Sequence, residues 1–175
     1  YDAGGLGDMG QHYIDPVQYL LGKDDTSPIK VEVDAPQQHP DAVGTWRSIT
    51  YTYEDGCQIV LWGGDYGNPD TPYIAGPKGN VYKNFVCDIP DWEKKLAEYP
   101  EPAPQNDNFI ECVRTRQKFA LNEVNGYYSA TIVNMGGIAL RLNRTLHYDP
   151  VKQEFINDPE ANRLLNQTTR SPWNI

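Results

Sequence analysis

The spacing of apolar residues changes along the chain from a helical period to a strand period. Over residues 8–21 the apolar side chains fall at helical spacing, and Gly22 follows as a natural C-terminal stop. Asp15-Pro16 lies inside this segment and is compatible with a helix that bends or restarts there. Residues 29–35 (IKVEVDA) then alternate between apolar and polar positions, which predicts a half-buried strand.

The next segments predict paired strands. Residues 45–63 hold two β-rich runs joined by Asp55-Gly56, the strongest short hairpin signal. Two more strands are expected around residues 72–76 and 79–85, joined through Pro77-Lys78-Gly79. Together with residues 29–35, these runs predict an antiparallel sheet of at least five strands.

Two helices are predicted in the second half of the chain. Residues 108–117 and 123–142 place apolar residues three and four positions apart, and Asn122 is the expected N-cap of the second helix. Gly136-Gly137 inside that helix favours close packing against a neighbouring element. The expected core residues of this helix are Val124, Tyr127, Tyr128, Val133, Met135, Ile138 and Leu142.

Shorter elements complete the pattern. Residues 92–99 predict a short helix, and the Pro-rich residues 99–108 are interpreted as a surface connection inside one domain. Residues 145–149 predict a short strand, and Asp158-Pro159-Glu160 predicts the start of a last helix. Strands in one block with helices around it indicate an α+β domain, in which helices cover one face of an open, mainly antiparallel sheet.

Composition narrows the class of protein. The chain has 175 residues and a formal net charge of −9, which disfavours nucleic acid and anionic membranes as partners. No run of about 20 apolar residues is present, so a membrane span is not expected. The three cysteines, Cys57, Cys87 and Cys112, are far apart, and we interpret them as free thiols.

The first residues contain a glycine pattern, G-x-G-x-x-G, at Gly5, Gly7 and Gly10. A dinucleotide-binding loop needs a strand before this pattern, and only four residues precede Gly5. Asp8 would also place a carboxylate close to the phosphates. The phosphate-loop interpretation is therefore disfavoured.

The same segment carries a second pattern of ionisable residues. Asp8, His12 and Asp15 are spaced so that a helix places all three on one face. An imidazole between two carboxylates is suited to proton transfer. A metal site is the weaker alternative, because His39 and His147 stand alone and supply no further ligand cluster, so no metal is expected.

Two aromatic residues are candidate sugar contacts. Trp62 and Tyr66, in LWGGDYGNPD, are suited to stacking on a sugar ring. An ordinary strand end and loop explain the same residues equally well.

Residues 4–22 (GGLGDMGQHYIDPVQYLLG) resemble the segment that opens the C-terminal substrate domain of the Gfo/Idh/MocA oxidoreductase family. GPKGNV at 76–81, NFIECVRTRQ at 108–117 and the tail from residue 138 to RSPW at 170–173 are similar to later family segments, in the same order. The resemblance covers nearly the whole chain. It implies that residues 1–175 are a single substrate-binding α/β domain, one piece of a longer two-domain chain.

The resemblance also implies a mechanism. An upstream Rossmann domain, absent here, would bind NAD or NADP, and a Glu-Lys-Pro motif in it would supply an active-site lysine. His12 matches the family's acid/base histidine, and Asp8 matches the aspartate that binds substrate hydroxyls and helps place that lysine. Asp15 would accept a hydrogen bond from the other imidazole nitrogen. The cofactor supplies the hydride chemistry.

The expected full-length protein is an oxidoreductase acting on a sugar, polyol or related carbohydrate, assembled as a homodimer or homotetramer through the sheet face. Two alternatives stay open, namely an NAD-dependent glycoside hydrolase without net redox change and a non-catalytic assembly domain. The isolated chain is expected to be inactive and not to bind NAD(H). The substrate, the choice between NAD and NADP, and a cytoplasmic or exported location are left open by the sequence.

Overall fold

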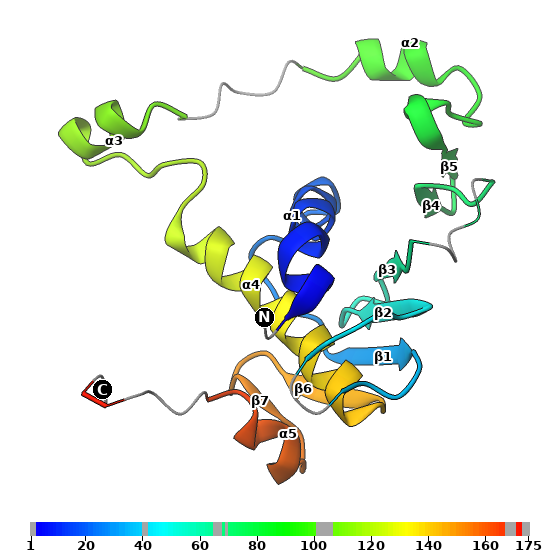
Figure 1. Cartoon of the computed structure of the whole chain (residues 1–175). Coiled ribbons are helices and arrows are strands. Elements are labelled where there is room, and N and C mark those ends of the chain that lie inside the picture. The colour runs from blue at the N-terminus through cyan, green and yellow to red at the C-terminus, as the bar shows by residue number, and fades with distance from the viewer. Residues whose placement is uncertain are drawn as a thin grey trace. The chain divides into compact units, whose positions relative to one another are not determined.

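A computed structural model describes residues 3–39, 42–64, 68, 70–100, 107–166 and 171–172 of the chain (Figure 1). Contacts divide the chain into two compact units. The first comprises Tyr1–Tyr66 with Leu121–Ile175, and the second comprises Gly67–Ala120. Each unit is described separately below.

The first unit is built on a five-stranded antiparallel sheet with the strand order β3-β2-β1-β6-β7. The strands are β1 (Lys30–Asp34), β2 (Ser48–Thr52), β3 (Gln58–Trp62), β6 (Leu146–Asp149) and β7 (Glu154–Phe155). The hairpin predicted at Asp55-Gly56 joins β2 to β3, and Gly56 has a φ of 83° that a residue with a side chain rarely adopts. On its other edge β1 pairs with β6, which lies more than 100 residues further along the chain.

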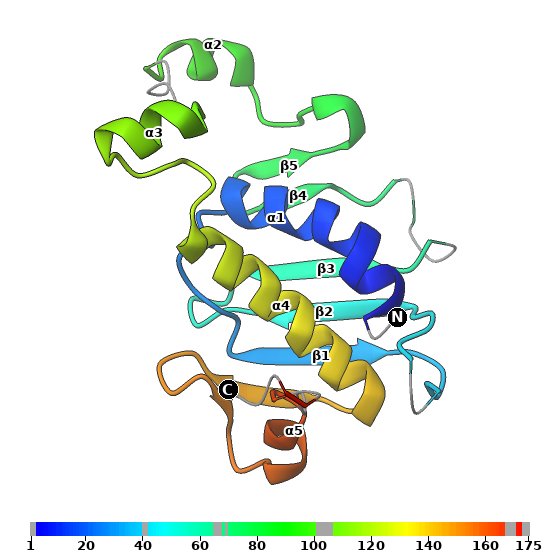
Figure 2. The ribbon, with the colours of Figure 1, turned by 60° about the vertical axis from the view of Figure 1, so that its left-hand side comes forward.

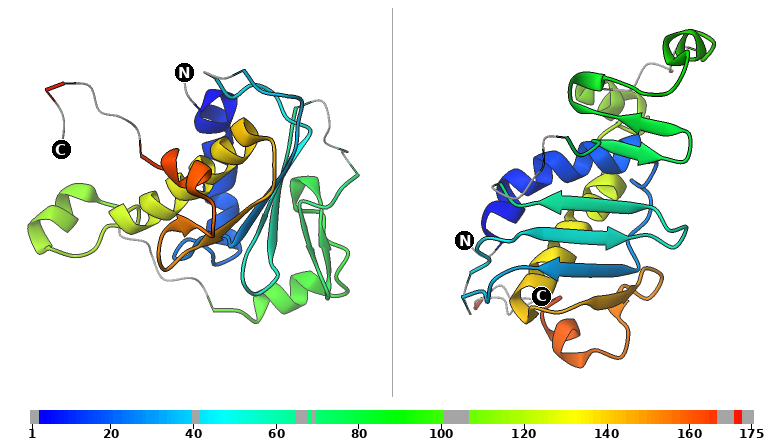
Figure 3. Two further views of the ribbon diagram at one scale, coloured as in Figure 1. Left: turned by 90° about the horizontal axis from the view of Figure 1, so that it is seen from below. Right: turned by 90° about the vertical axis from the view of Figure 1, so that its right-hand side faces the viewer.

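Helices cover one face of this sheet. The π-helical turn η1 (Leu6–Gly10) continues into α1 (Gln11–Leu20), and α1 lies beside the long helix α4 (Glu123–Leu142) across the strands (Figure 2). The short helix α5 (Pro159–Arg163) packs against β7. The views in Figure 3 show the opposite face of β1, β2 and β3 without a covering helix of the first unit.

Strand alternation separates the two faces of the sheet. Val31, Tyr51 and Ile59 pair across three strands and are buried against the helices. The α4 side of the core holds Ile132, Met135, Ala139 and Leu140, all nearly or fully buried. Leu6 and Ile14 add the apolar side of η1 and α1 to the same cluster.

Local signals set the helix ends. The Asn122 side chain accepts a hydrogen bond from the Val124 backbone N–H at 3.0 Å, as predicted for the N-cap of α4. Asp158 caps α5 in the same way, accepting from the Ala161 backbone N–H at 3.0 Å. Pro16 lies inside α1, and the helix runs through it to the stop at Gly22, whose φ is 62°.

The second unit contains short elements: β4 (Ile74–Gly76), β5 (Gly79–Val81), the turn η2 (Lys83–Phe85), α2 (Trp92–Ala97) and α3 (Phe109–Thr115). β4 and β5 pair as a two-stranded sheet of their own. Cys112 is the one buried apolar side chain among the residues of this unit that the structure describes.

The predicted helices and most of the predicted strands are confirmed, and the α+β class is correct. The strand expected over residues 79–85 ends at Val81, and Lys83–Phe85 form the turn η2. The membership of the main sheet is also wrong in one respect. The strands expected at residues 72–76 and 79–85 pair with each other outside the main sheet, and β6 and β7 complete the five strands instead. A two-residue turn specifies which strands form a hairpin but carries no information about the next neighbour. The order of the sheet therefore depends on distant contacts.

The predicted core of α4 is partly confirmed. Val133, Met135 and Ile138 are buried, whereas Val124 and Tyr127 are 38% and 40% exposed and were wrongly assigned to the core. The buried residues of α4 begin only at Ser129, and Tyr128 is half-buried, so the first turns of the helix lie outside the core. Leu142 packs on the edge of the core.

No helix in the described parts of the chain is long and apolar enough to cross a membrane. The three cysteines are free thiols, as predicted: Cys112 is buried, and Cys57 and Cys87 are half-buried.

Candidate functional site

Close packing explains why glycine occupies positions 4, 7 and 10, without any bound phosphate. Gly4 has a φ of 50°, and a Cβ there would overlap the Val43 carbonyl oxygen. A Cβ at Gly7 would overlap the Ala3 side chain, and one at Gly10 would lie 3.1 Å from Leu6 Cδ1. These glycines let the π-helical turn form and pack closely. The segment is a helix, in agreement with the sequence-based interpretation.

The helix formed by η1 and α1 has a buried side and an exposed side. Leu6, Gly10, Ile14 and Gln18 recur every fourth residue and are buried. Asp8, His12 and Asp15 are all exposed. The fold therefore turns all three ionisable side chains away from its own core and presents them together on one accessible helix face.

Asp8, His12 and Asp15 make no side-chain hydrogen bond to one another or to any other residue that the structure describes. The bond expected from the His12 imidazole to Asp15 is thus not formed in this state of the chain. The acid/base role of His12 and the supporting roles of Asp8 and Asp15 stay predictions. The helix itself contains no lysine or arginine.

Two glutamines of the helix formed by η1 and α1 bind it to neighbouring elements through hydrogen bonds. Gln11 Nε2 donates a hydrogen bond to the buried Ser129 Oγ of α4. Gln18 Nε2 donates to the Tyr53 hydroxyl at 3.3 Å, just after the end of β2. Burial raises the pKa of Tyr53 to about 12, so this hydroxyl stays protonated at neutral pH.

The C-terminal end of the helix is tied to the β2–β3 hairpin. Lys23 Nζ lies 2.6 Å from Asp55 Oδ2 and 5.3 Å from the centre of the Tyr53 ring. The hydrogen bond from Lys23 lowers the pKa of the Asp55 carboxyl below its usual range. The helix that carries Asp8, His12 and Asp15 is therefore held near its middle by Gln11 and at its C-terminal end by Gln18 and Lys23.

The two aromatic candidates are not brought to this face. Trp62 is the last residue of β3 and is 47% exposed, and strand alternation from the buried Ile59 places it on the open face of the sheet, opposite α1 and α4. Tyr66 lies outside the described residues. Sugar contacts by these two residues stay predictions.

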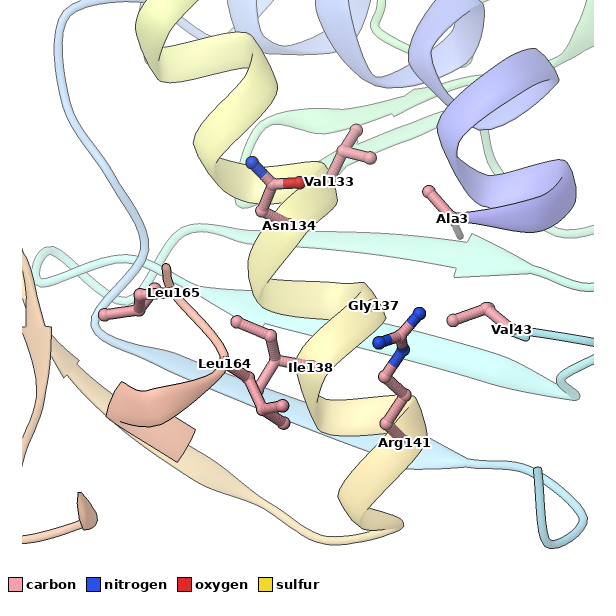
Figure 4. A pocket seen from close by; sticks show the side chains of 9 residues that line it. All are labelled: Ala3, Val43, Val133, Asn134, Gly137, Ile138, Arg141, Leu164 and Leu165. Carbon is pink, nitrogen blue, oxygen red and sulfur yellow. The ribbon is translucent and has the colours of Figure 1, made fainter. Parts of the chain in front are cut away.

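A separate cavity of about 340 Å³ lies along α4 in the first unit (Figure 4). Its lining combines apolar side chains with the polar Asn134 and Arg141, so it exposes both polar and apolar surface. Sequence reasoning did not find it, because it is formed where Val43, Leu164 and Leu165 approach α4 from distant parts of the chain. It contains none of the three ionisable residues of the helix face.

In the described ranges, no group of three histidine, cysteine, aspartate or glutamate side chains is placed to hold a metal ion. His39 is in an isolated β-bridge with Ala42, and His147 is exposed on β6.

The chain matches a known protein family. A protein-family model described as "Oxidoreductase family, C-terminal alpha/beta domain", of the Gfo/Idh/MocA group, matches residues 1–175. No curated protein and no solved structure matches the chain significantly.

Proposed function

Because the chain belongs to the Gfo/Idh/MocA oxidoreductase family as its C-terminal α/β domain, we propose that it binds the substrate of an NAD(P)-dependent enzyme acting on a sugar, polyol or related carbohydrate. The observation that carries the proposal is the exposed helix face with Asp8, His12 and Asp15. Catalytic side chains must be accessible to the substrate and carried by a firmly anchored element, and this helix face meets both conditions.

The side chains on the helix face are suited to a position beside the cofactor, where the substrate binds. The helix face offers acid/base and hydrogen-bonding groups, but no basic side chain that would pair with a pyrophosphate. The nicotinamide, when bound by an upstream domain, supplies hydride acceptance or donation. This chain supplies the proton chemistry and the contacts to substrate.

His12 is the proposed acid/base group. Removal of hydride from an alcohol carbon requires the hydroxyl proton to leave, and the imidazole accepts it at a ring nitrogen. Asp8, one turn before His12, accepts hydrogen bonds from substrate hydroxyls. Asp15 accepts a hydrogen bond from the second ring nitrogen once the imidazole is charged, which stabilises the protonated form.

The test uses the full-length protein with its upstream domain. A panel of sugars and polyols is screened by NAD(P)H absorbance for the wild type, His12→Ala and His147→Ala. His147 is a matched control, because it is an exposed histidine at another position of the same unit. Loss of about 10²-fold or more in kcat for His12→Ala alone is expected.

Other outcomes of this screen identify the alternatives. Product formed without net NAD(P)H would indicate a redox-neutral glycoside hydrolase. Unchanged turnover in His12→Ala would contradict the acid/base proposal and leave an assembly role for the domain.

The open face of the sheet is the proposed surface for self-association. Val60 and Trp62 of β3 are 41% and 47% exposed there and lie beside Thr50 and Ser48 of β2. Exposed apolar side chains on an uncovered sheet favour packing against a second copy. Val60→Glu should lower the mass measured by light scattering at micromolar concentration. Val151→Glu, at a fully solvated turn, should leave that mass unchanged.

A further inference from the structure

Gln11 is a polar residue on the side of α1 that packs against α4. It directly precedes His12 in the chain and stands where the π-helical turn changes into an α-helix. Its partner, Ser129, is 5% exposed and is the first buried residue of α4. The Gln11–Ser129 hydrogen bond is therefore a polar link inside a largely apolar contact between the two helices.

A hydrogen bond defines the rotation of this helix more sharply than apolar packing does. The inner side of the helix near Gln11 consists of Leu6, Gly10 and Ile14, and Gly10 offers no side chain to interlock. Burial of apolar surface is non-directional, whereas a hydrogen bond fixes both a distance and an angle. A directional contact at Gln11 therefore decides the rotation of the helix at that point.

That rotation sets the position of the imidazole. A catalytic side chain must be held within about 0.5 Å and 10–20° of its productive geometry. His12 has no side-chain hydrogen bond to another described residue, so its placement depends on the backbone that carries it. The backbone is fixed next to it by Gln11, and almost two turns further on by the Gln18–Tyr53 bond.

We infer that Gln11 and Ser129 are positioning residues, which orient the helix so that His12 reaches the substrate. The inference rests on the proposed acid/base function of His12. It assigns neither residue a contact with substrate or cofactor.

The decisive variants are Ser129→Thr and Ser129→Val in the full-length protein. Thr and Val have nearly the same shape and add the same bulk to α4, but only Thr keeps the hydroxyl that accepts from Gln11. We expect Ser129→Val to lower kcat about tenfold relative to Ser129→Thr, with little change in KM, because substrate binding is kept while proton transfer is misaligned.

Gln11→Leu should give the same loss as Ser129→Val, and the double variant should lose no more than either single variant. Thr131→Val is the matched control, since Thr131 lies two residues from Ser129 on α4 and its Oγ1 donates to the Tyr127 backbone carbonyl of the same helix at 2.8 Å. This control should keep the wild-type kcat. Equal kcat for Ser129→Thr and Ser129→Val would overturn the inference, whether or not both variants are less stable than wild type.

A second readout does not depend on turnover. In ¹H–¹⁵N spectra of the imidazole rings of the full-length protein, the signals that disappear in His12→Ala are those of His12, and the signals that disappear in His147→Ala serve as an internal reference. Ser129→Val should shift the His12 signals, and Ser129→Thr should leave them in place. If the protein turns over no sugar or polyol but the shift is seen, the proposed function fails and the positioning role stands. If His12 is active and its signals are unmoved by Ser129→Val, the positioning role fails alone.

Discussion

The close packing of α4 on Tyr51 predicts opposite effects for two adjacent glycines. A Cβ added at Gly136 would overlap the hydroxyl oxygen of Tyr51 and lie 3.1 Å from Leu6 Cδ2. Tyr51 is fully buried and cannot move toward solvent. A Cβ at Gly137 would meet no described atom within 4 Å. Both residues lie inside α4, so the backbone effect of an alanine is the same for each.

The magnitudes follow from these contacts. Replacing glycine by alanine inside a helix stabilises it by about 1 kcal/mol. Overpacking a rigid core costs about 1–3 kcal/mol, and the overlap with Tyr51 places Gly136→Ala at the upper end. We therefore expect Gly136→Ala to lower the free energy of unfolding by about 2 kcal/mol and Gly137→Ala to raise it by about 1 kcal/mol.

The assay is thermal unfolding followed by far-UV circular dichroism. For a chain of this size about 1 kcal/mol corresponds to roughly 2–4 °C in Tm. Gly136→Ala should therefore lower Tm by about 4–8 °C, while Gly137→Ala raises it by about 2–4 °C. Changes of the same sign and size for the two variants would refute the packing argument.

A double-mutant cycle identifies the atom responsible. The Tyr51 hydroxyl is buried with no hydrogen-bond partner among the described residues, and burial raises its pKa above its usual range. Tyr51→Phe removes the oxygen that Gly136→Ala would strike, while the Cζ atom 3.2 Å from the added Cβ stays. Gly136→Ala should be clearly less harmful in the Tyr51→Phe background. Simple additivity would show that another contact limits the space.

Two further predictions concern the ends of helices. Arg144 donates two hydrogen bonds to the carboxylate of Asp158 and lowers the pKa of that carboxyl to about 2. The ionised Asp158 therefore stabilises the folded state fully above about pH 4, and this contribution is lost between pH 4 and pH 2. Asp158→Asn keeps the helix cap but removes the charge, so it should lower the free energy of unfolding by about 1 kcal/mol at pH 7. Its profile of Tm against pH should be flatter than that of the wild type, and an equally steep profile would contradict the assignment. Gly4→Ala should lower Tm by several degrees, since it combines a φ of 50° with overlap on the Val43 carbonyl; an unchanged Tm would show that the first turn relaxes freely.

Much of the fold is specified by short-range signals. Asn122 begins α4, Asp55-Gly56 forms the β2–β3 turn, and Asp158 begins α5, because each signal acts within a few residues. The sheet order and the exposed start of α4 were not predictable in this way. They depend on which distant segments meet, such as Lys30 with His147.

The candidate site was predictable in part. The spacing of Asp8, His12 and Asp15 implies a shared helix face, and the structure exposes all three. The hydrogen bond from Gln11 to Ser129 was not predictable, since it joins residues 118 positions apart. The π-helical turn at Leu6–Gly10 also has no sequence period of its own, and it becomes evident only through the packing of its glycines.

The pairing of β1 with β6 has a consequence for folding during synthesis on the ribosome. β1 pairs with the nearby β2 on one edge, but β6, its partner on the other edge, begins 112 residues after β1 ends (from Asp34 to Leu146). At ~5–20 residues per second, the nascent chain carries an unpaired strand edge for on the order of ten seconds. A chain ending before Leu146 would never close that edge, so premature termination should yield aggregates and not a smaller folded domain.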